Sequence, residues 1–239
     1  MIVNRTINRP YCDVTISIRD GDKDDEAVID EMFGQNVYRL AAWQLSQDRP
    51  IVFDIGANIG AFTLLSLSIA LEAGRPIDIY AVEPERQNRE LLVKNIDQNP
   101  ALLANGSTVT IISKALSNFI GSDTISEESG SSRIGSGDQP IDVTTLDAVL
   151  RGIDRVDFMK IDIEGSEIPL VSGAYKESLL KSHHYAIEFD QSNSTKDFLN
   201  IITPFLSDFS ISTWGVPSRG CNIYLENHSW SKREDNDNS

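Results

Sequence analysis

Three apolar segments of the chain each end in residues that could bind a ligand or move a proton. The first segment runs into Asp54 and Gly56, the second into Glu83, and the third into Asp162 and Glu164. Carboxylates accept hydrogen bonds from hydroxyl groups and take up protons, and a glycine lets the backbone turn sharply beside a ligand. In a parallel sheet, ligands bind outside the carboxyl ends of the strands, where the chain order reverses. The three endings therefore predict one shared site.

Residues 53–60, FDIGANIG, have the composition of a turn between a strand and a helix at a nucleoside site. Gly56 and Gly60 permit a sharp turn and a close approach of the backbone to a ligand. The helix that follows points its N-terminal amides at whatever lies there. Glu83 comes 23 residues after Gly60, where a carboxylate can accept both hydroxyls of a ribose.

Asn58 helps to choose between nucleoside cofactors. It stands where the dinucleotide fingerprint G-x-G-x-x-G has its second glycine, and its side chain would obstruct a pyrophosphate. A cofactor without phosphate, S-adenosylmethionine, therefore fits better than a nicotinamide dinucleotide. Asp54, the backbone at Gly56 and the side chain of Asn58 could bind its ammonium and carboxylate groups.

Methyl transfer to an acceptor that must lose a proton would also need a base, which contributes roughly 10²- to 10⁴-fold to the rate. Asp162 and Glu164 lie where this base is expected. Asp162 could equally cap the helix that opens near Gly165, or orient the cofactor. Lys160 alternates with apolar residues and shares a face of the strand with Asp162, so the two could also form a structural ion pair.

The sequence indicates no metal site and no disulfide. His183 and His184 precede another strand and one could serve as the base, but neighbours on a strand face opposite ways, and a lone histidine is more often structural. Cys12 and Cys221 are far apart and lack metal-ligand spacing. The acidic residues between 162 and 167 fit the start of a helical turn as well as they fit a metal site.

The elements that must position these residues alternate along the chain. Short apolar runs rich in β-branched residues predict buried parallel strands, and longer periodic segments predict the helices between them. The order predicts an α/β, Rossmann-like sheet of about seven strands with right-handed crossovers. The expected strands are at 50–56, 76–84, 107–116, 156–162, 183–190, 210–216 and 221–227, and the expected helices at 58–74, 85–99, 144–152 and 195–209.

Outside this core, the sequence predicts three further parts. An N-terminal cap at 1–49 has a strand at 13–19 and a helix at 25–45, and it either packs beside the sheet or meets the substrate. Residues 118–139, dense in Gly, Ser and Asp, predict an exposed, mobile loop, which is either a tolerated insertion or a lid. The main domain then covers 50–229, and residues 230–239 form a frayed tail.

Three blocks of the sequence resemble a known family. VFDIGANIGAFTL (52–64), AVEPERQNRELLVKNI (81–96) and VDFMKIDIEGSEIPLVSGA (156–174) look like the signature blocks of the FkbM-type methyltransferases, a branch of the class I S-adenosylmethionine-dependent enzymes. The resemblance implies a seven-stranded, mostly parallel sheet with the last strand antiparallel and helices on both faces. It also implies methyl transfer, most often to a hydroxyl of a sugar, glycan or secondary metabolite.

Carried over by position, the resemblance assigns most of the cofactor site. It implies that Glu83 binds the ribose and that residues at the end of the third strand lie near the adenine. The residues implied to contact the cofactor are Asp54, Gly56, Asn58, Gly60, Glu83, Lys114, Ala115 and Ser117. The N-terminal cap and the loop at 118–139 match no signature block.

Composition narrows the partners. The 36 acidic and 21 basic side chains give a net charge of −15, which repels phosphate backbones and argues against nucleic acid. No secretory signal and no bilayer-spanning stretch is evident, so a cytoplasmic protein is expected. Two other functions stay open: a nicotinamide-dependent oxidoreductase, which would use the same Glu83, and a non-catalytic scaffold that binds an adenosyl group.

Overall fold

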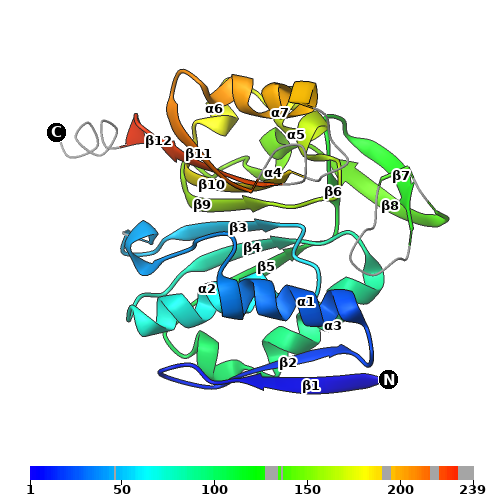
Figure 1. The fold of residues 1–239 in the computed structure, drawn as a ribbon, viewed down its shortest axis with the longest axis vertical. Helices are drawn as coiled ribbons and strands as arrows, with labels where there is room; N and C mark the ends of the chain where they lie inside the picture. Colours follow the sequence, from blue (N-terminus) through cyan, green and yellow to red (C-terminus); the bar gives the residue numbers. More distant parts are fainter. Residues whose placement is uncertain (46, 127–133, 136, 190–194, 216–220, 231–239) are drawn as a thin grey trace.

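A twisted sheet of seven strands runs through the middle of the molecule (Figure 1). The structure, a computed structural model, describes residues 1–45, 47–126, 134–135, 137–189, 195–215 and 221–230. The strand order is β11-β12-β10-β9-β3-β4-β5. The strands are β3 (Ile51–Ile55), β4 (Asp78–Val82), β5 (Thr108–Ile112), β9 (Val156–Ile161), β10 (Ser182–Phe189), β11 (Phe209–Gly215) and β12 (Cys221–Asn227).

The predicted seven-stranded, mostly parallel sheet is confirmed. β12 pairs antiparallel with both β10 and β11, and the other pairs are parallel. The chain order reverses between β3 and β9, because the chain leaves β3 toward β4 and β5 and returns on the other side to β9. Ile55 lies opposite both Val82 and Ile161. The residues that follow these three strands therefore emerge together at one edge.

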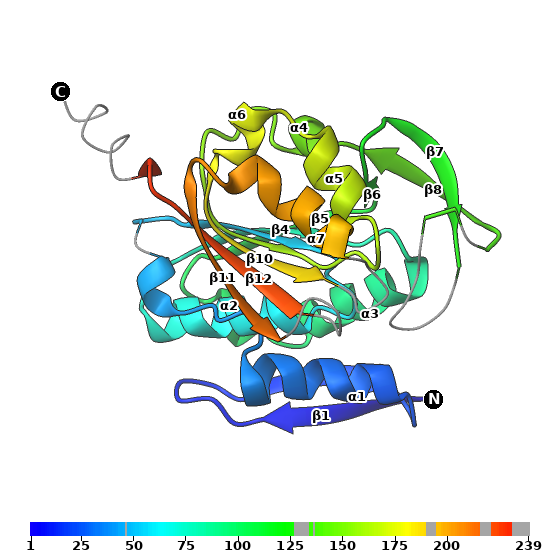
Figure 2. The same cartoon turned by 45° about the horizontal axis from the view of Figure 1, so that its top comes forward.

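Helices cover both faces of the sheet, as predicted for this fold (Figures 1 and 2). Two clusters of buried apolar residues, one on each face, form the core. The central strands β3, β4 and β9 are mostly apolar because both faces of the sheet are covered. One face carries α1 (Lys23–Ile29), α2 (Ala61–Glu72) and α3 (Arg86–Asp97), and the other carries α4 (Leu146–Val149), α5 (Glu167–Gly173), α6 (Lys176–Leu179) and α7 (Thr195–Ile202).

The N-terminal residues add a layer outside α2 and α3. β1 (Ile2–Ile7) and β2 (Val14–Arg19) form an antiparallel hairpin, and Asn95 of α3 accepts a hydrogen bond from the backbone N–H of Ser17 at 2.7 Å. Ten of the twelve residues of α2 are buried, since the sheet covers one side and the hairpin the other. This double covering explains why α2 is apolar all round.

The predicted cap helix at 25–45 is wrong in extent. α1 ends at Ile29, a wide π turn (Asp30–Gln35) follows, and Asn36 is left-handed with a φ of 48°. Asn tolerates this conformation and ends helices. The strand expected at 13–19 is present as β2, whereas its partner β1 was not predicted.

The predicted loop at 118–139 contains a strand. β7 (Gly121–Ile125) pairs with β8 (Gln139–Thr144), and β6 (Ala115–Leu116) completes a small second sheet. Few of the side chains of β7 are apolar, so no periodic pattern predicted this strand, but pairing with β8 buries Ile125. An isolated bridge joins Ile125 to Ile134. Residues 127–133 and 136, and the predicted tail beyond residue 230, lie outside the described part.

Candidate functional site

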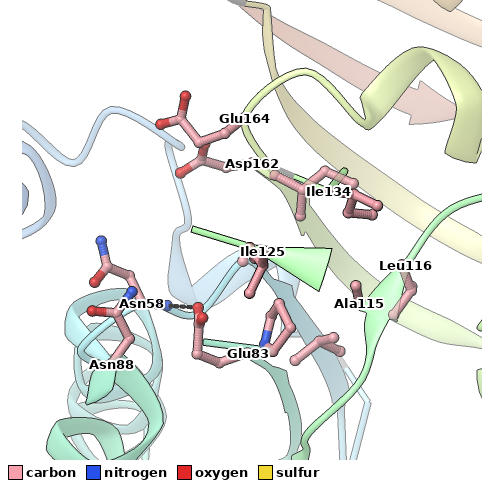
Figure 3. Close-up of a pocket in the computed structure, with 13 residues that line it drawn as sticks. Asn58, Glu83, Asn88, Ala115, Leu116, Ile125, Ile134, Asp162 and Glu164 are labelled. Atoms are coloured by element: carbon pink, nitrogen blue, oxygen red, sulfur yellow. Dashed lines mark hydrogen bonds between the residues drawn. The ribbon is translucent and has the colours of Figure 1, made fainter. Parts of the chain in front are cut away.

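A cavity opens at the carboxyl edge of β3, β4 and β9, beside the reversal of chain order (Figure 3). The space between its lining atoms amounts to about 610 Å³, part of which is open solvent. One wall is polar and comes from the turns after the three strands, and the opposite wall is apolar and comes from the second sheet. The lining residues are Gly56, Asn58, Val82, Glu83, Pro84, Asn88, Ala115, Leu116, Ile125, Ile134, Asp162, Ile163 and Glu164.

The two glycines of the 53–60 turn make room for neighbouring parts of the protein. Gly56 has a φ of 81°, and a Cβ there would lie 1.7 Å from the backbone oxygen of Asp162. Gly60 has a φ of 91°, and its Cβ would lie 2.5 Å from Leu92 of α3. The predicted sharp turn is present, and only glycine fits it. The close approach that the structure describes is to the β9 turn and to α3.

Glu83 is held by two backbone amides. Asn58 N–H donates to one carboxylate oxygen at 2.7 Å and Glu85 N–H to the other at 2.9 Å. The side chain is 5% exposed, and burial raises its pKa to about 7 although both amides favour the charged form. Each carboxylate oxygen can accept a second hydrogen bond. Glu83 therefore keeps the capacity to bind two hydroxyl groups at the cavity.

Asn58 and Asn88 carry amide oxygens that lack a partner. Both Oδ1 atoms are buried and find no hydrogen bond within the described residues, and both side chains lie on the same side of the cavity (Figure 3). An unpaired buried acceptor costs about 1–3 kcal/mol, so the pair points to a polar ligand group. Sequence reasoning missed Asn88. Asn88 could have been found from its position in the first turn of the helix that follows Glu83.

Asp54 and Lys160 lie beneath the cavity and do not line it. Asp54 is fully buried, accepts a hydrogen bond from the Thr63 hydroxyl at 2.7 Å, and lies 3.3 Å from Lys160 Nζ. Lys160 Nζ also donates to the carbonyl of Gly56 at 2.6 Å and lies 3.4 Å from Asp162.

The charges of this pair follow from its surroundings. Burial lowers the pKa of Lys160, but Asp54 and Asp162 outweigh burial and raise it. Burial also raises the pKa of Asp54, against the pull of Lys160. The raised pKa of Lys160 favours an ionised pair, whereas the raised pKa of Asp54 favours a neutral one. The pair is ionised, because the oxygens within reach of the ammonium are all acceptors. Lys160 thus fixes the turns after β3 and β9 in place.

Asp162 faces two residues that sequence reasoning did not assign to the site. The hydroxyl of Tyr38 lies 2.8 Å from Asp162 and 3.2 Å from Glu188. The carboxylate of Asp162 is the main cause that raises the pKa of Glu188 to about 9, with burial second. Glu188 is therefore protonated at pH 7. Glu188 ends the next strand, so the strand-end rule could have found it. No sequence signal places Tyr38, which is 124 residues from Asp162.

A wider cavity lies on the other side of Asp162. The space between its lining atoms amounts to about 1510 Å³, part of which is open solvent. Asp162 and Glu164 line both cavities, so they form a shared wall, which we call the carboxylate wall. Glu164 has a φ of 53°, an uncommon conformation outside glycine that concentrates at functional sites. The wider cavity is lined by Glu31, Gln35, Val37, Tyr38, Asp162, Glu164, Glu167, Glu188, Phe189, Trp214, Gly215, Cys221 and Asn222.

Glu167 holds the turn that carries this wall. Its two carboxylate oxygens accept hydrogen bonds from the backbone amides of Ile163 and Gly165, both at 2.9 Å. Burial raises the pKa of Glu167 to about 7. The helix-start role that was one option for Asp162 therefore belongs to Glu167, and Asp162 is left facing the two cavities.

The remaining predicted residues divide between the cavity and its surroundings. Ala115 lines the cavity. Lys114 is half exposed and pairs with Asp142 at 3.8 Å, and Ser117 is buried, with its N–H bonded to the carbonyl of Thr144. His183 and His184 lie at the start of β10, away from the carboxyl edge. That position separates both histidines from the candidate base at Asp162.

The strand ends that form the site lie in a segment of the chain that matches a known protein family. Residues 54–210 match the model of the methyltransferase FkbM domain. The chain belongs to the methyltransferase FkbM domain family. The matched residues run from Asp54 through the carboxylate wall to the first two residues of β11, so they contain β4, β5, β9 and β10 and the end of β3, and they leave out β12.

Solved structures share the fold of this FkbM domain. The methyltransferase FkbM from Methylobacillus flagellatus is 19% identical, with a TM-score of 0.56, and the match covers 83% of this chain and 47% of that one. This chain thus spans about half the length of that protein. A chain of the fibrillarin/Nop5p complex (17% identity, TM-score 0.47, 76% and 74% covered) and TrmN from Thermus thermophilus (12%, 0.46, 82% and 48%) also match.

No curated protein matches this chain in sequence. Among the described residues, none of the helices combines the length and the apolar character that crossing a membrane requires.

Proposed function

We propose that this FkbM domain transfers a methyl group from S-adenosylmethionine to a hydroxyl of a sugar, glycan or secondary metabolite. The observation that carries the proposal is the carboxylate wall, because Asp162 and Glu164 line both cavities. A transfer reaction needs two adjoining sites whose ligands meet at one point, and groups that handle a proton at that point. Family membership supports methyl transfer over hydride transfer.

The narrower cavity fits the methyl donor. Glu83 presents a carboxylate with free accepting capacity for ribose hydroxyls, and the unpaired oxygens of Asn58 and Asn88 suit donor groups of the ligand. The apolar side, which includes Ile125 and Ile134 from the segment at 118–139, suits an adenine ring. When bound, S-adenosylmethionine supplies a methyl group on a sulfonium, which is already activated for in-line displacement.

The wider cavity suits the methyl acceptor. Its carboxylates accept hydrogen bonds from hydroxyl groups, and Trp214, which is half exposed, offers a flat apolar surface beside them. The same carboxylates disfavour phosphorylated acceptors, in agreement with the net charge of −15. The acceptor is therefore a neutral or cationic polyhydroxyl compound.

Asp162 is the proposed proton acceptor. Its partner Glu188 holds a proton, and the hydroxyl of Tyr38 and the ammonium of Lys160 fix the position of Asp162. In the transfer, the acceptor oxygen would form its bond to the methyl carbon as the carbon–sulfur bond breaks, the bonding electrons would stay on sulfur to give the neutral thioether, and the proton of the acceptor hydroxyl would pass to the carboxylate of Asp162. Glu164, on the same wall, orients the acceptor.

Binding and turnover test the proposal separately. We expect S-adenosylhomocysteine to raise the melting temperature of the domain and NAD to leave it unchanged. Stabilisation by NAD alone would overturn the methyl-donor assignment in favour of an oxidoreductase. Asn88→Leu removes one unpaired oxygen from the cavity wall and should weaken binding of S-adenosylhomocysteine, whereas Asn105→Leu, on an exposed turn between α3 and β5, should not.

Labelled methyl donor and fractionated cell extract then identify the acceptor. We expect a labelled product with the wild-type domain and at least roughly tenfold less with Asp162→Asn, since the amide cannot accept the proton. The mutant should still bind S-adenosylhomocysteine. Binding without a labelled product in any fraction would favour the scaffold function.

A further inference from the structure

A second cluster of ligand-type side chains lies at the start of β10, away from the carboxylate wall. His184 of β10 lies directly opposite Glu226 of β12, so the two side chains stand on the same face of the sheet. One ring nitrogen of His183, one of His184 and a carboxylate oxygen of Glu226 all lie within 4.8 Å of one another. No part of the proposed methyl transfer uses these residues.

His184 is set up as a ligand. Its ring is 4% exposed, and Nδ1 lies 3.3 Å from the carbonyl oxygen of Asp157. A carbonyl can only accept, so Nδ1 carries the proton and Nε2 presents a lone pair. Nε2 is buried and finds no hydrogen bond within the described residues. A ring whose far nitrogen donates to a carbonyl is the usual outer support of a metal-binding histidine.

His183 turns toward the same point. Neighbours on a strand were expected to face opposite ways, but the two imidazole centroids are only 3.9 Å apart. Trp230 stacks on His183 at 4.8 Å with an interplanar angle of 4°, and Trp43 packs edge-on against His184. Nδ1 of His183 is also buried without a partner in the described chain. The indole rings thus hold two imidazoles whose buried nitrogens are unsatisfied.

We propose that His183, His184 and Glu226 bind a divalent zinc-class metal ion. Two imidazoles and one carboxylate are a common ligand set for zinc, which keeps a fourth position for water. Two atoms bound to one tetrahedral zinc ion lie about 3.4 Å apart, since each bond is about 2.1 Å. The three groups, whose atoms lie within 4.8 Å of one another, must therefore approach by up to about 1.4 Å. Glu226 is exposed and free to rotate toward the rings, and a cavity beside His184 and Glu226 gives the ion a path of entry.

The metal would act on the fold and not on the methyl acceptor. His184 precedes Glu188 of the wider cavity by four residues along β10, a distance of roughly 13 Å. An ion at His183, His184 and Glu226 would tie β10 to β12, the antiparallel strand near the edge of the sheet. Because binding favours the folded state, the ion should raise the melting temperature.

The test uses the untagged full chain with Zn²⁺ and Co²⁺ as probes. Isothermal titration should give one Zn²⁺ per chain, and Co²⁺ should produce a visible absorption band. His183→Phe keeps a ring against Trp230 but cannot bind metal, and Glu226→Gln changes an exposed residue. Both variants should lose the Co²⁺ band and the Zn²⁺-dependent rise in melting temperature. His228→Ala is the matched control, since His228 is exposed, bonds to Ser210 and lies outside the cluster.

Three results would overturn the site. They are absence of one-to-one Zn²⁺ binding by the wild-type chain, binding unchanged in both His183→Phe and Glu226→Gln, and an equal loss in His228→Ala. Each of these results would mean that the two histidines only pack in an aromatic stack with Trp230 and do not bind metal. None of these readouts depends on methyl transfer, so failure of the metal site and failure of the proposed function are distinguishable.

Discussion

Replacement of Gly56 by alanine should separate the ends of β3 and β9, and the structure sets the size of the effect. At a φ of 81°, any residue other than glycine costs about 1–2 kcal/mol. The new Cβ would also lie 1.7 Å from the carbonyl oxygen of Asp162. Gly56 and Asp162 directly follow the paired strands β3 and β9, and neither backbone can move alone. The two turns must therefore part, which adds about 1–3 kcal/mol. The free energy of unfolding should fall by about 2–5 kcal/mol in total.

Gly74→Ala separates the two contributions. Gly74 has a φ of 68°, and a Cβ there meets nothing within 4 Å. It carries the same conformational cost and the same entropic gain of alanine in the unfolded chain, but no overlap. Urea unfolding of the two variants should therefore give midpoints that differ by the equivalent of about 1–3 kcal/mol, with unchanged slopes. Equal midpoints would refute the close contact between the turns after β3 and β9.

Other predictions concern the charges and hydrogen bonds of the site. Affinity for S-adenosylhomocysteine, measured by calorimetry, should rise about tenfold per pH unit up to about pH 7 and then level off. The reason is that Glu83 in the free protein is protonated below its raised pKa of about 7, whereas the ribose hydroxyls bind its ionised form. An affinity that does not depend on pH would contradict this role of Glu83. Lys160→Met should cost about 3–5 kcal/mol in urea unfolding, since it leaves buried carboxylates without their cation. Arg49→Met, which removes an exposed pair with Asp78, should cost far less because solvent screens that pair, and similar losses would refute the buried ion pair. Tyr38→Phe removes only the hydroxyl that bonds Asp162, so turnover should fall while the KM for the methyl donor is unchanged; unchanged turnover would remove Tyr38 from the site.

Local patterns predicted the frame of the site well, for a physical reason. β9 is buried along its whole length, and four of its six residues are therefore apolar; β3 is apolar at every position except Asp54. Parallel pairing then fixes where such runs end. Gly56, Glu83 and Asp162 could be brought together from the sequence because the sheet itself aligns them.

The sequence could not separate the wall of the cavity from what lies behind it. Asp54 and Glu83 both end strands, but Asp54 is covered by Thr63 and Lys160, whereas Glu83 borders the cavity. A strand covered on both faces gives no period-2 signal that would tell these directions apart. Tyr38 was missed because it reaches Asp162 through tertiary packing of the cap, which no local pattern encodes.

The charge balance of the site connects the fold to the proposed chemistry. Lys160 is the only cation that contacts the carboxylate wall within the described residues, and it is bound by Asp54, Asp162 and the carbonyl of Gly56. Glu188 avoids a second charge beside Asp162 by holding its proton. Among the described residues, the acidic groups at this edge of the sheet thus outnumber Lys160. Such an edge favours a cationic ligand over a neutral one of the same shape. We therefore expect the domain to bind the sulfonium donor more tightly than its neutral thioether product, and to lose that preference in Asp162→Asn.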